Sequence, residues 1–180
     1  MKKESDESLM IAVKKGDLDS MAPLFESYQV RLFNFFLRLT YNRDLSQDLT
    51  QNVFYRIIKY RNTYNPEYKF RTWMYQMARN ILADHYEKNK LTTSDYYEAD
   101  KITGNIENEF DEIEKKEQHQ ELYEAMSKLS DEQRELLILS RFHGLKYEEI
   151  SKINETSVGA IKVKIHRAIN KLREVYFENA

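Results

Sequence analysis

The chain has 180 residues, of which 41% are hydrophobic and 13% aromatic, enough for the cores of one or two small globular domains. It has no cysteine, which excludes disulfides, thiolate nucleophiles and cysteine-based zinc sites. The formal net charge of −2 is unevenly spread, because residues 56–90 carry 8 basic and 3 acidic side chains whereas residues 91–135 carry 5 and 14. A second basic region, residues 136–180, follows the acidic one.

The composition favours helices throughout. Only four glycines and two prolines occur, and no segment alternates convincingly between apolar and polar residues as a strand does. We therefore expect an all-α fold of two small helical domains. No apolar run approaches the length of a membrane span, and residues 1–7 are too polar for a signal peptide, so we expect a cytoplasmic protein without membrane insertion.

Apolar residues at helical spacing predict four helices in the first half of the chain, at about residues 7–15, 21–39, 45–60 and 70–88. Gly16 is expected to end the first helix, and Ser20 and Asp44 to cap the second and third. The pair Asn65-Pro66 predicts a loop between the third and fourth helices. We expect these helices to form one domain, residues 1–89.

A polar, acidic stretch around Gly104 separates this domain from the next. Apolar periodicity fades there, so residues 90–111 are expected to be a flexible linker. The apolar periodicity resumes in residues 112–180, which we expect to form the second domain. Ser130 and Gln133 predict a capping box at a helix start, and Gly144 predicts a helix end.

Residues 147–173 have the pattern of a helix-turn-helix: a short helix, a tight connection and a second helix, apolar on one side and basic on the other. Between Val158 and Arg173 there are five Lys or Arg and no Asp or Glu, which suits contact with phosphates. A solvated basic face is the alternative. The candidate contacts to duplex DNA are Ser157, Gly159, Ala160, Lys162, Val163, Lys164, Arg167 and Lys171.

The segment 60–79 alternates aromatic rings with cations, a combination that suits unstacked bases, because rings stack on bases and cations follow the backbone. Phe70, Trp73 and Met77 share a helical spacing that favours a place in the core. For Tyr64, Tyr68 and Tyr75 we expect a functional role instead. The candidate contacts to single-stranded DNA in this segment are Arg61, Tyr64, Tyr68, Lys69, Arg71, Trp73, Tyr75 and Arg79.

Four strings in order carry a resemblance to a known family. Residues 48–54 (DLTQNVF) and 70–80 (FRTWMYQMARN) resemble the region 2 signatures of the extracytoplasmic-function group of bacterial RNA polymerase sigma factors. Residues 144–150 (GLKYEEI) and 158–162 (VGAIK), followed by residues 166–168 (HRA), are similar to the region 4 helix-turn-helix of the same group. The resemblance covers nearly the whole chain.

The resemblance implies a role for each part. Asp48, Gln51, Asn52 and Tyr55, which share one face of a helix, would dock on the clamp helices of core RNA polymerase, although a solvated face explains the same pattern. The segment 60–79, with Asn80, would capture the melted non-template strand of the minus-ten element, its bases flipped into the 62–69 loop. The basic helix would recognise the minus-thirty-five element as duplex.

The implied partners are core RNA polymerase, through its clamp helices and flap, and promoter DNA, both duplex and single-stranded. An anti-sigma factor is a further partner common in the family, and neither a cofactor nor a metal is expected. The acidic linker would thread the RNA channel of the polymerase, or serve as a plain disordered tether.

Three positions depart from the family pattern. Asn52 replaces the usual acidic residue, which predicts somewhat weaker clamp binding. Glu155 stands where glycine is usual, which predicts a strained turn in the helix-turn-helix. Lys146 replaces a common serine cap.

Two other function classes fit less well. An enzyme is disfavoured because the four histidines are scattered and no phosphate-binding loop or nucleophile motif occurs. An operator-binding regulator that acts without polymerase would use the second domain, but it leaves the aromatic and basic segment 60–79 without a role.

Overall fold

The computed structural model describes residues 4–92 and 113–178. Helices form every regular element in these ranges, with no strand, which confirms the all-α expectation. The chain divides into two compact units, the first built from helices α1–α4 and the second from α5–α8. Nearly all of the expected acidic linker lies outside the described residues. Within the described ranges, no helix has the length and apolar character needed to cross a membrane.

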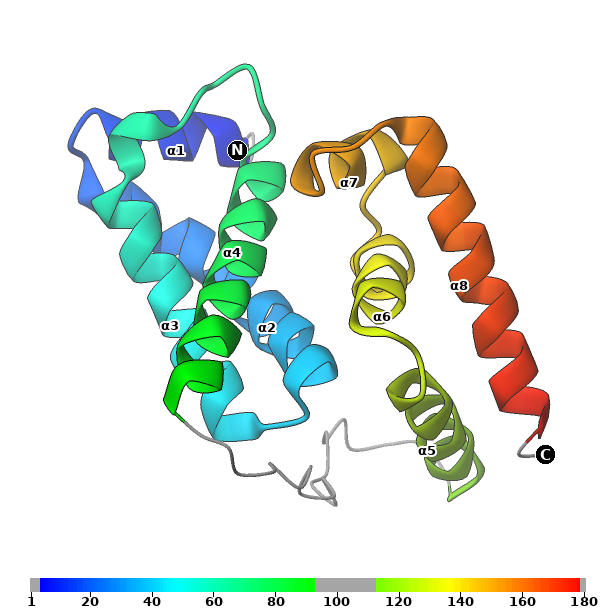
Figure 1. Cartoon of the computed structure of the whole chain (residues 1–180). Coiled ribbons are helices and arrows are strands. Elements are labelled where there is room, and N and C mark those ends of the chain that lie inside the picture. Colours follow the sequence, from blue (N-terminus) through cyan, green and yellow to red (C-terminus); the bar gives the residue numbers. More distant parts are fainter. Residues whose placement is uncertain (1–3, 93–112, 179–180) are drawn as a thin grey trace. The chain divides into compact units, whose positions relative to one another are not determined.

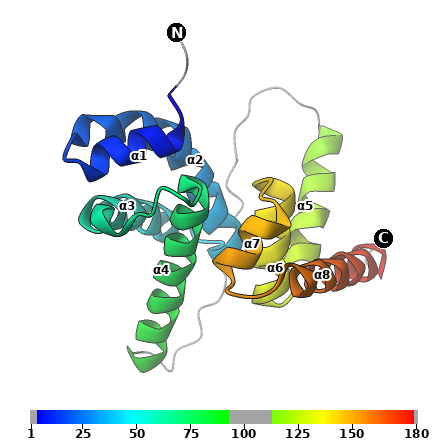
Figure 2. The same ribbon diagram turned by 90° about the horizontal axis from the view of Figure 1, so that it is seen from above.

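The first unit is a bundle of α1 (Asp6–Lys14), α2 (Met21–Thr40), α3 (Arg43–Lys59) and α4 (Phe70–Thr92), with 3-10 turns η1 (Leu18–Ser20) and η2 (Arg61–Thr63). Helix α2 packs against α3, α3 against α4, and α1 against α2 (Figures 1 and 2). The core is apolar and aromatic. Its fully enclosed side chains include Leu24, Leu32, Phe35, Phe36, Val53, Ile57, Phe70 and Met74.

Two expected helix caps are wrong. Helix α3 begins earlier than expected, because the Asn42 side chain, on extended backbone, accepts a hydrogen bond from the Leu45 amide at 2.9 Å. Asp44 instead lies in the first turn, where its negative charge stabilises the helix by interacting with the positive end of the helix dipole. Ser20 has helical backbone angles and donates to Asp17 at 2.7 Å, so it does not cap α2. Gly16, with φ of +106°, follows α1 as expected.

The second unit contains α5 (Ile113–Ser127), α6 (Asp131–Leu137), a π-helical turn η3 (Ile138–Phe142), α7 (Tyr147–Ile153) and α8 (Val158–Glu178). Helix α8 runs along α6 and α5 (Figure 1). Both expected boundary signals are confirmed. Ser130 and Gln133 form a complete capping box, and Gly144, with a φ of +63°, follows the cap residue His143 at the end of η3.

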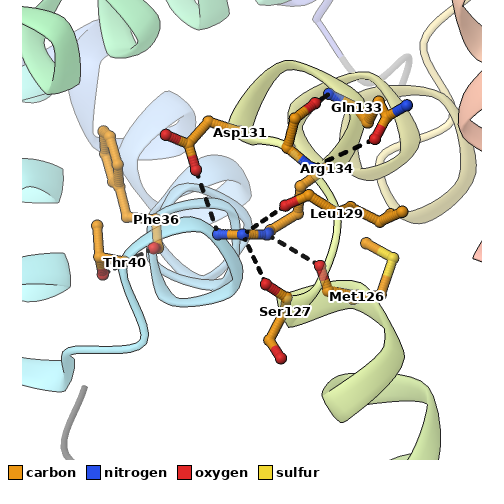
Figure 3. A network of polar contacts seen from close by, with 9 residues as sticks. Phe36, Thr40, Met126, Ser127, Leu129, Asp131, Gln133 and Arg134 are labelled. Atoms are coloured by element: carbon orange, nitrogen blue, oxygen red, sulfur yellow. Dashed lines mark hydrogen bonds and ion pairs between the residues drawn. The ribbon is translucent and has the colours of Figure 1, made fainter. Parts of the chain in front are cut away.

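A buried arginine joins α5 to α6. The Arg134 side chain donates to three main-chain oxygens, those of Met126 at 3.1 Å, Ser127 at 3.2 Å and Leu129 at 3.0 Å (Figure 3). Asp131 lies 3.7 Å from the same guanidinium. The last carbonyls of a helix have no partner within the helix, so Arg134 supplies the donors that the end of α5 lacks.

Candidate nucleic-acid interface

Helix α8 has one buried and one exposed face, as its sequence predicts. Ile161, Ile165, Ala168 and Val175 are buried against the second unit. The opposite side exposes half of the Val163 side chain, an apolar group of the kind that contacts thymine methyls. Of the other candidate residues, Ser157, Gly159, Lys162, Arg167 and Lys171 are exposed, whereas Ala160 and Lys164 are half-buried.

The cations of α8 differ in their partners. Lys164 binds Glu132 of α6 at 2.5 Å, and Lys171 binds Glu174 at 3.2 Å. Within the described residues, Lys162 and Arg167 form no ion pair. Because their charges are exposed and not neutralised by a carboxylate there, these two side chains are the best placed to meet phosphates or base edges.

The turn before α8 is tight and partly strained. Glu155 has a φ of +51°, in the left-handed region that favours glycine, which confirms the strained turn expected at this position. The Thr156 amide donates to the Ser151 carbonyl at 3.0 Å, and the Ser157 hydroxyl accepts from the Ala160 amide at 3.1 Å. Ser157 therefore caps α8, and its hydroxyl is already engaged.

Tyr64 is not an exposed stacking platform, contrary to expectation. Its ring is fully buried, with centroids 5.3 Å from Trp73 and 6.4 Å from Phe70. Its hydroxyl donates to the Tyr68 carbonyl at 2.9 Å. Burial, with a smaller contribution from the carboxylate of Glu7, raises the pKa of Tyr64 to about 12, so the phenol stays protonated and keeps donating. Tyr64 is an anchor of the loop.

Tyr75 is also buried, with 2% of its surface exposed, and its ring centroid lies 5.4 Å from that of Phe35 in α2. The expectation that Tyr75 contacts DNA is wrong, because Phe35 of α2 covers its ring while α4 also packs against α3 and α1. Burial raises the pKa of the Tyr75 phenol above its ordinary value. Tyr75 belongs to the core of the first unit.

The remaining candidates of this segment line an accessible surface. Tyr68 is 46% exposed, and Lys69 and Asn80 are exposed with it. Trp73 is half-buried, with its ring centroid 5.3 Å from that of Tyr64. The half-buried arginines of the segment are Arg61, Arg71 and Arg79.

The polar face of α3 is confirmed as a surface. Asp48, Gln51 and Tyr55 are exposed and Asn52 is half-buried, whereas Leu49, Val53 and Ile57 point into the core. Beside this face lies an open hollow of about 350 Å³ between α2 and α3, which sequence reasoning did not identify. Its lining residues are Phe25, Gln29, Val30, Phe33, Arg43, Gln47, Thr50 and Gln51.

Comparison with known proteins identifies the two units. Residues 24–92 match the family model for Sigma-70 region 2, and residues 119–172 match that for Sigma-70, region 4. The first match contains α3 and the 62–69 loop, and the second contains α8 as far as residue 172.

Relatives align over almost the whole chain. The ECF RNA polymerase sigma factor SigM of Bacillus subtilis is 30% identical over 155 residues, covering 85% of this chain and 93% of that protein. The RNA polymerase sigma factor CarQ of Myxococcus xanthus is 28% identical over 165 residues, covering 92% of this chain and 94% of that protein.

Solved structures share the fold. CnrH, solved in complex with the cytosolic domain of CnrY, superposes with a TM-score of 0.75 at 19% identity, covering 98% of this chain and 100% of that one. The sigma factor RpoE of Bartonella quintana gives a TM-score of 0.73 at 22% identity, covering 86% and 95%. Because both regions match and SigM is 30% identical to this chain, the chain belongs to the extracytoplasmic-function sigma factors of RNA polymerase, transcription initiation factors that direct the polymerase to promoters.

Proposed function

We propose a division of the promoter between the two units. The exposed face of α3 docks core RNA polymerase, the 62–69 loop and α4 hold the melted minus-ten strand, and α8 recognises the minus-thirty-five element as duplex. The observation that carries this proposal is α8, whose buried stripe fixes it in the second unit while Lys162 and Arg167 remain exposed. We place this activity in the cytoplasm, where polymerase and promoters meet.

Single-strand capture rests on the exposed groups of the first unit. Tyr68 and the half-buried Trp73 provide ring surface, and Lys69 and Asn80 provide polar contacts. Stacking on such rings contributes about 1 to 3 kcal/mol per base, which offsets the cost of unpairing. Tyr64 and Tyr75 are left out of this contact set because their rings are enclosed.

We also propose an anti-sigma partner for this chain. The support is that the RpoE structure of similar fold was solved with the anti-sigma factor NepR. Phe25 and Val30, 41% and 62% exposed, border the hollow beside the α3 face and give such a partner apolar surface to cover.

The proposal predicts that promoter DNA is bound tightly only with polymerase. Transcripts made in vitro by core polymerase and this protein on a genomic library would first identify a promoter. On that fragment the holoenzyme should bind at least tenfold more tightly than the protein alone, and more tightly still when the minus-ten region is premelted. Equally tight duplex binding by the protein alone would instead identify an operator-binding regulator.

The docking face supplies the control for this experiment. Asp48→Arg reverses an exposed charge on α3 and should weaken association with core polymerase. Asp19→Arg reverses an exposed charge of the same unit that lies on η1, outside α3, and serves as the matched variant. If both variants bind core polymerase as the wild type does, the α3 face is not the docking surface.

Arg167 tests recognition of the upstream element. Arg167→Ala is expected to weaken holoenzyme binding to the duplex minus-thirty-five element by about tenfold and to relax discrimination at one base pair, since a bidentate arginine contact provides about 1 to 3 kcal/mol of discrimination. Arg173→Ala is the control, because that exposed arginine lies six residues along α8 and about 120° around it. Equal losses in binding titrations would mean that only net charge matters.

A further inference from the structure

Helix α1 contacts Tyr64 in the 62–69 loop and Phe70 directly after it, although α1 lies before the matched region 2 segment. The Lys14 ammonium donates to the Tyr64 carbonyl at 2.7 Å. The Glu7 carboxylate accepts from the Phe70 amide, the first of α4, at 3.2 Å. Figure 1 shows the loop between α3 and α4 beside α1. One short helix thus holds Tyr64 near the start of the loop and Phe70 immediately after its end.

Helix α1 is itself held in place by packing and by a hydrogen bond to α2. Leu9, Met10 and Val13 bury its apolar side in the first unit. Asp6 accepts a hydrogen bond from the Tyr28 hydroxyl of α2. The Tyr28 ring lies edge-on to Phe70, with 5.4 Å between centroids, so the same aromatic cluster supports α1 and the start of α4.

The loop between these two contacts has hydrogen bonds of its own. The Asn65 side chain accepts from the Glu67 amide at 3.0 Å, and the Asn65 carbonyl accepts from the Tyr68 amide at 3.1 Å. The Tyr64 hydroxyl donates to the Tyr68 carbonyl across the loop. These bonds fold the loop back on itself, while the Tyr68 and Lys69 side chains are exposed.

We propose that Lys14 and Glu7 are positioning residues that fix the shape of the 62–69 loop before unpaired bases enter it. The inference rests on the proposed capture of the minus-ten strand by this loop. A loop held in its binding shape loses less conformational entropy when a base is bound, and it distinguishes bases better because its contacts cannot shift. Lys14 holds Tyr64 through a charged hydrogen-bond donor. Glu7 holds Phe70 by accepting its amide hydrogen bond, and the negative charge of Glu7 also interacts favourably with the helix dipole at the start of α4.

The test uses holoenzyme on the promoter fragment with a premelted minus-ten region, in matched and single-base-mismatched versions. Lys14→Ala should weaken binding of the matched fragment about tenfold and lower the matched-to-mismatched ratio, while affinity for core polymerase stays within about twofold. Lys15→Ala removes the same charge from the next, exposed residue and should change neither quantity. Lys14→Arg, which retains a charged donor, should restore most of the base discrimination.

Glu7 provides an independent pair. Glu7→Ala should reduce discrimination among unpaired bases, and Glu4→Ala, at an exposed position outside the helix, should not. Equal discrimination by Lys14→Ala and Lys15→Ala would overturn the inference, as would a parallel loss of core affinity and thermal stability, which marks a purely structural role. A wild-type holoenzyme with no preference for the premelted fragment would overturn the proposed role of the loop as well.

Discussion

Tyr64→Ala is expected to lower the free energy of unfolding of the first unit by about 4 kcal/mol, the range found when a buried aromatic side chain is removed from a core. The ring is fully buried between Trp73 and Phe70, so its loss leaves a cavity that these neighbours cannot fill without moving. The chain has a single tryptophan, Trp73, 5.3 Å from the Tyr64 ring, so its fluorescence during urea unfolding measures this unit specifically.

Two companion variants separate the ring from the hydroxyl. Tyr64→Phe keeps the ring but loses the bond to the Tyr68 carbonyl, for an expected cost of about 1 kcal/mol. Tyr68→Ala removes a half-exposed ring and should cost about 0.5 kcal/mol or less. If Tyr64→Ala unfolds at the same urea concentration as Tyr68→Ala, Tyr64 does not anchor the loop in solution.

Arg134→Ala is expected to destabilise the second unit by about 3 kcal/mol, because three main-chain oxygens at the α5–α6 junction lose a charged donor together. Amide hydrogen exchange is the suitable measurement, since it resolves the two units and should show faster exchange throughout α5 and α6. Arg134→Lys should recover only part of the loss, because a single ammonium cannot reproduce the planar fork of the guanidinium.

Arg141→Ala is the matched control for this loss of charge. Arg141 is exposed on η3 in the same unit, and its replacement should leave the exchange of α5 and α6 near the wild-type rate. Should Arg134→Ala and Arg141→Ala exchange alike, the hydrogen bonds at the junction contribute little to stability.

Periodicity and local signals predicted the parts of the fold that depend on neighbouring residues. The exposed and buried faces of α8 follow from the spacing of Ile161 and Ile165, because burial of a helix repeats every 3.6 residues. The Ser130 capping box was predictable for the same reason, since its two hydrogen bonds join residues three apart. The family signatures predicted the family, which the comparisons confirm, whereas the assignment of each unit to a part of the promoter stays a prediction.

Contacts that no local pattern marks could not be predicted from the sequence. Tyr64 lies in a loop, where rings are commonly exposed, and only its packing on Trp73 and its bond to the Tyr68 carbonyl show that it is an anchor. Lys14 and Glu7 resemble ordinary charged residues of an amphipathic helix, and their partners lie 50 and 63 residues away. Arg134 likewise looks like a surface residue of α6, because its three acceptors are main-chain atoms that no side-chain pattern marks.

The 50 and 63 residues that separate Lys14 and Glu7 from their partners impose an order on folding during synthesis. The apolar side of α1 can be partly buried as soon as α2 has left the ribosome, since the two helices pack together. Its ties to Tyr64 and Phe70 form only after both residues emerge, and closure of such long intervals is entropically slow. The 62–69 loop of the nascent chain therefore reaches its final shape after the hydrophobic bundle beneath it has begun to assemble.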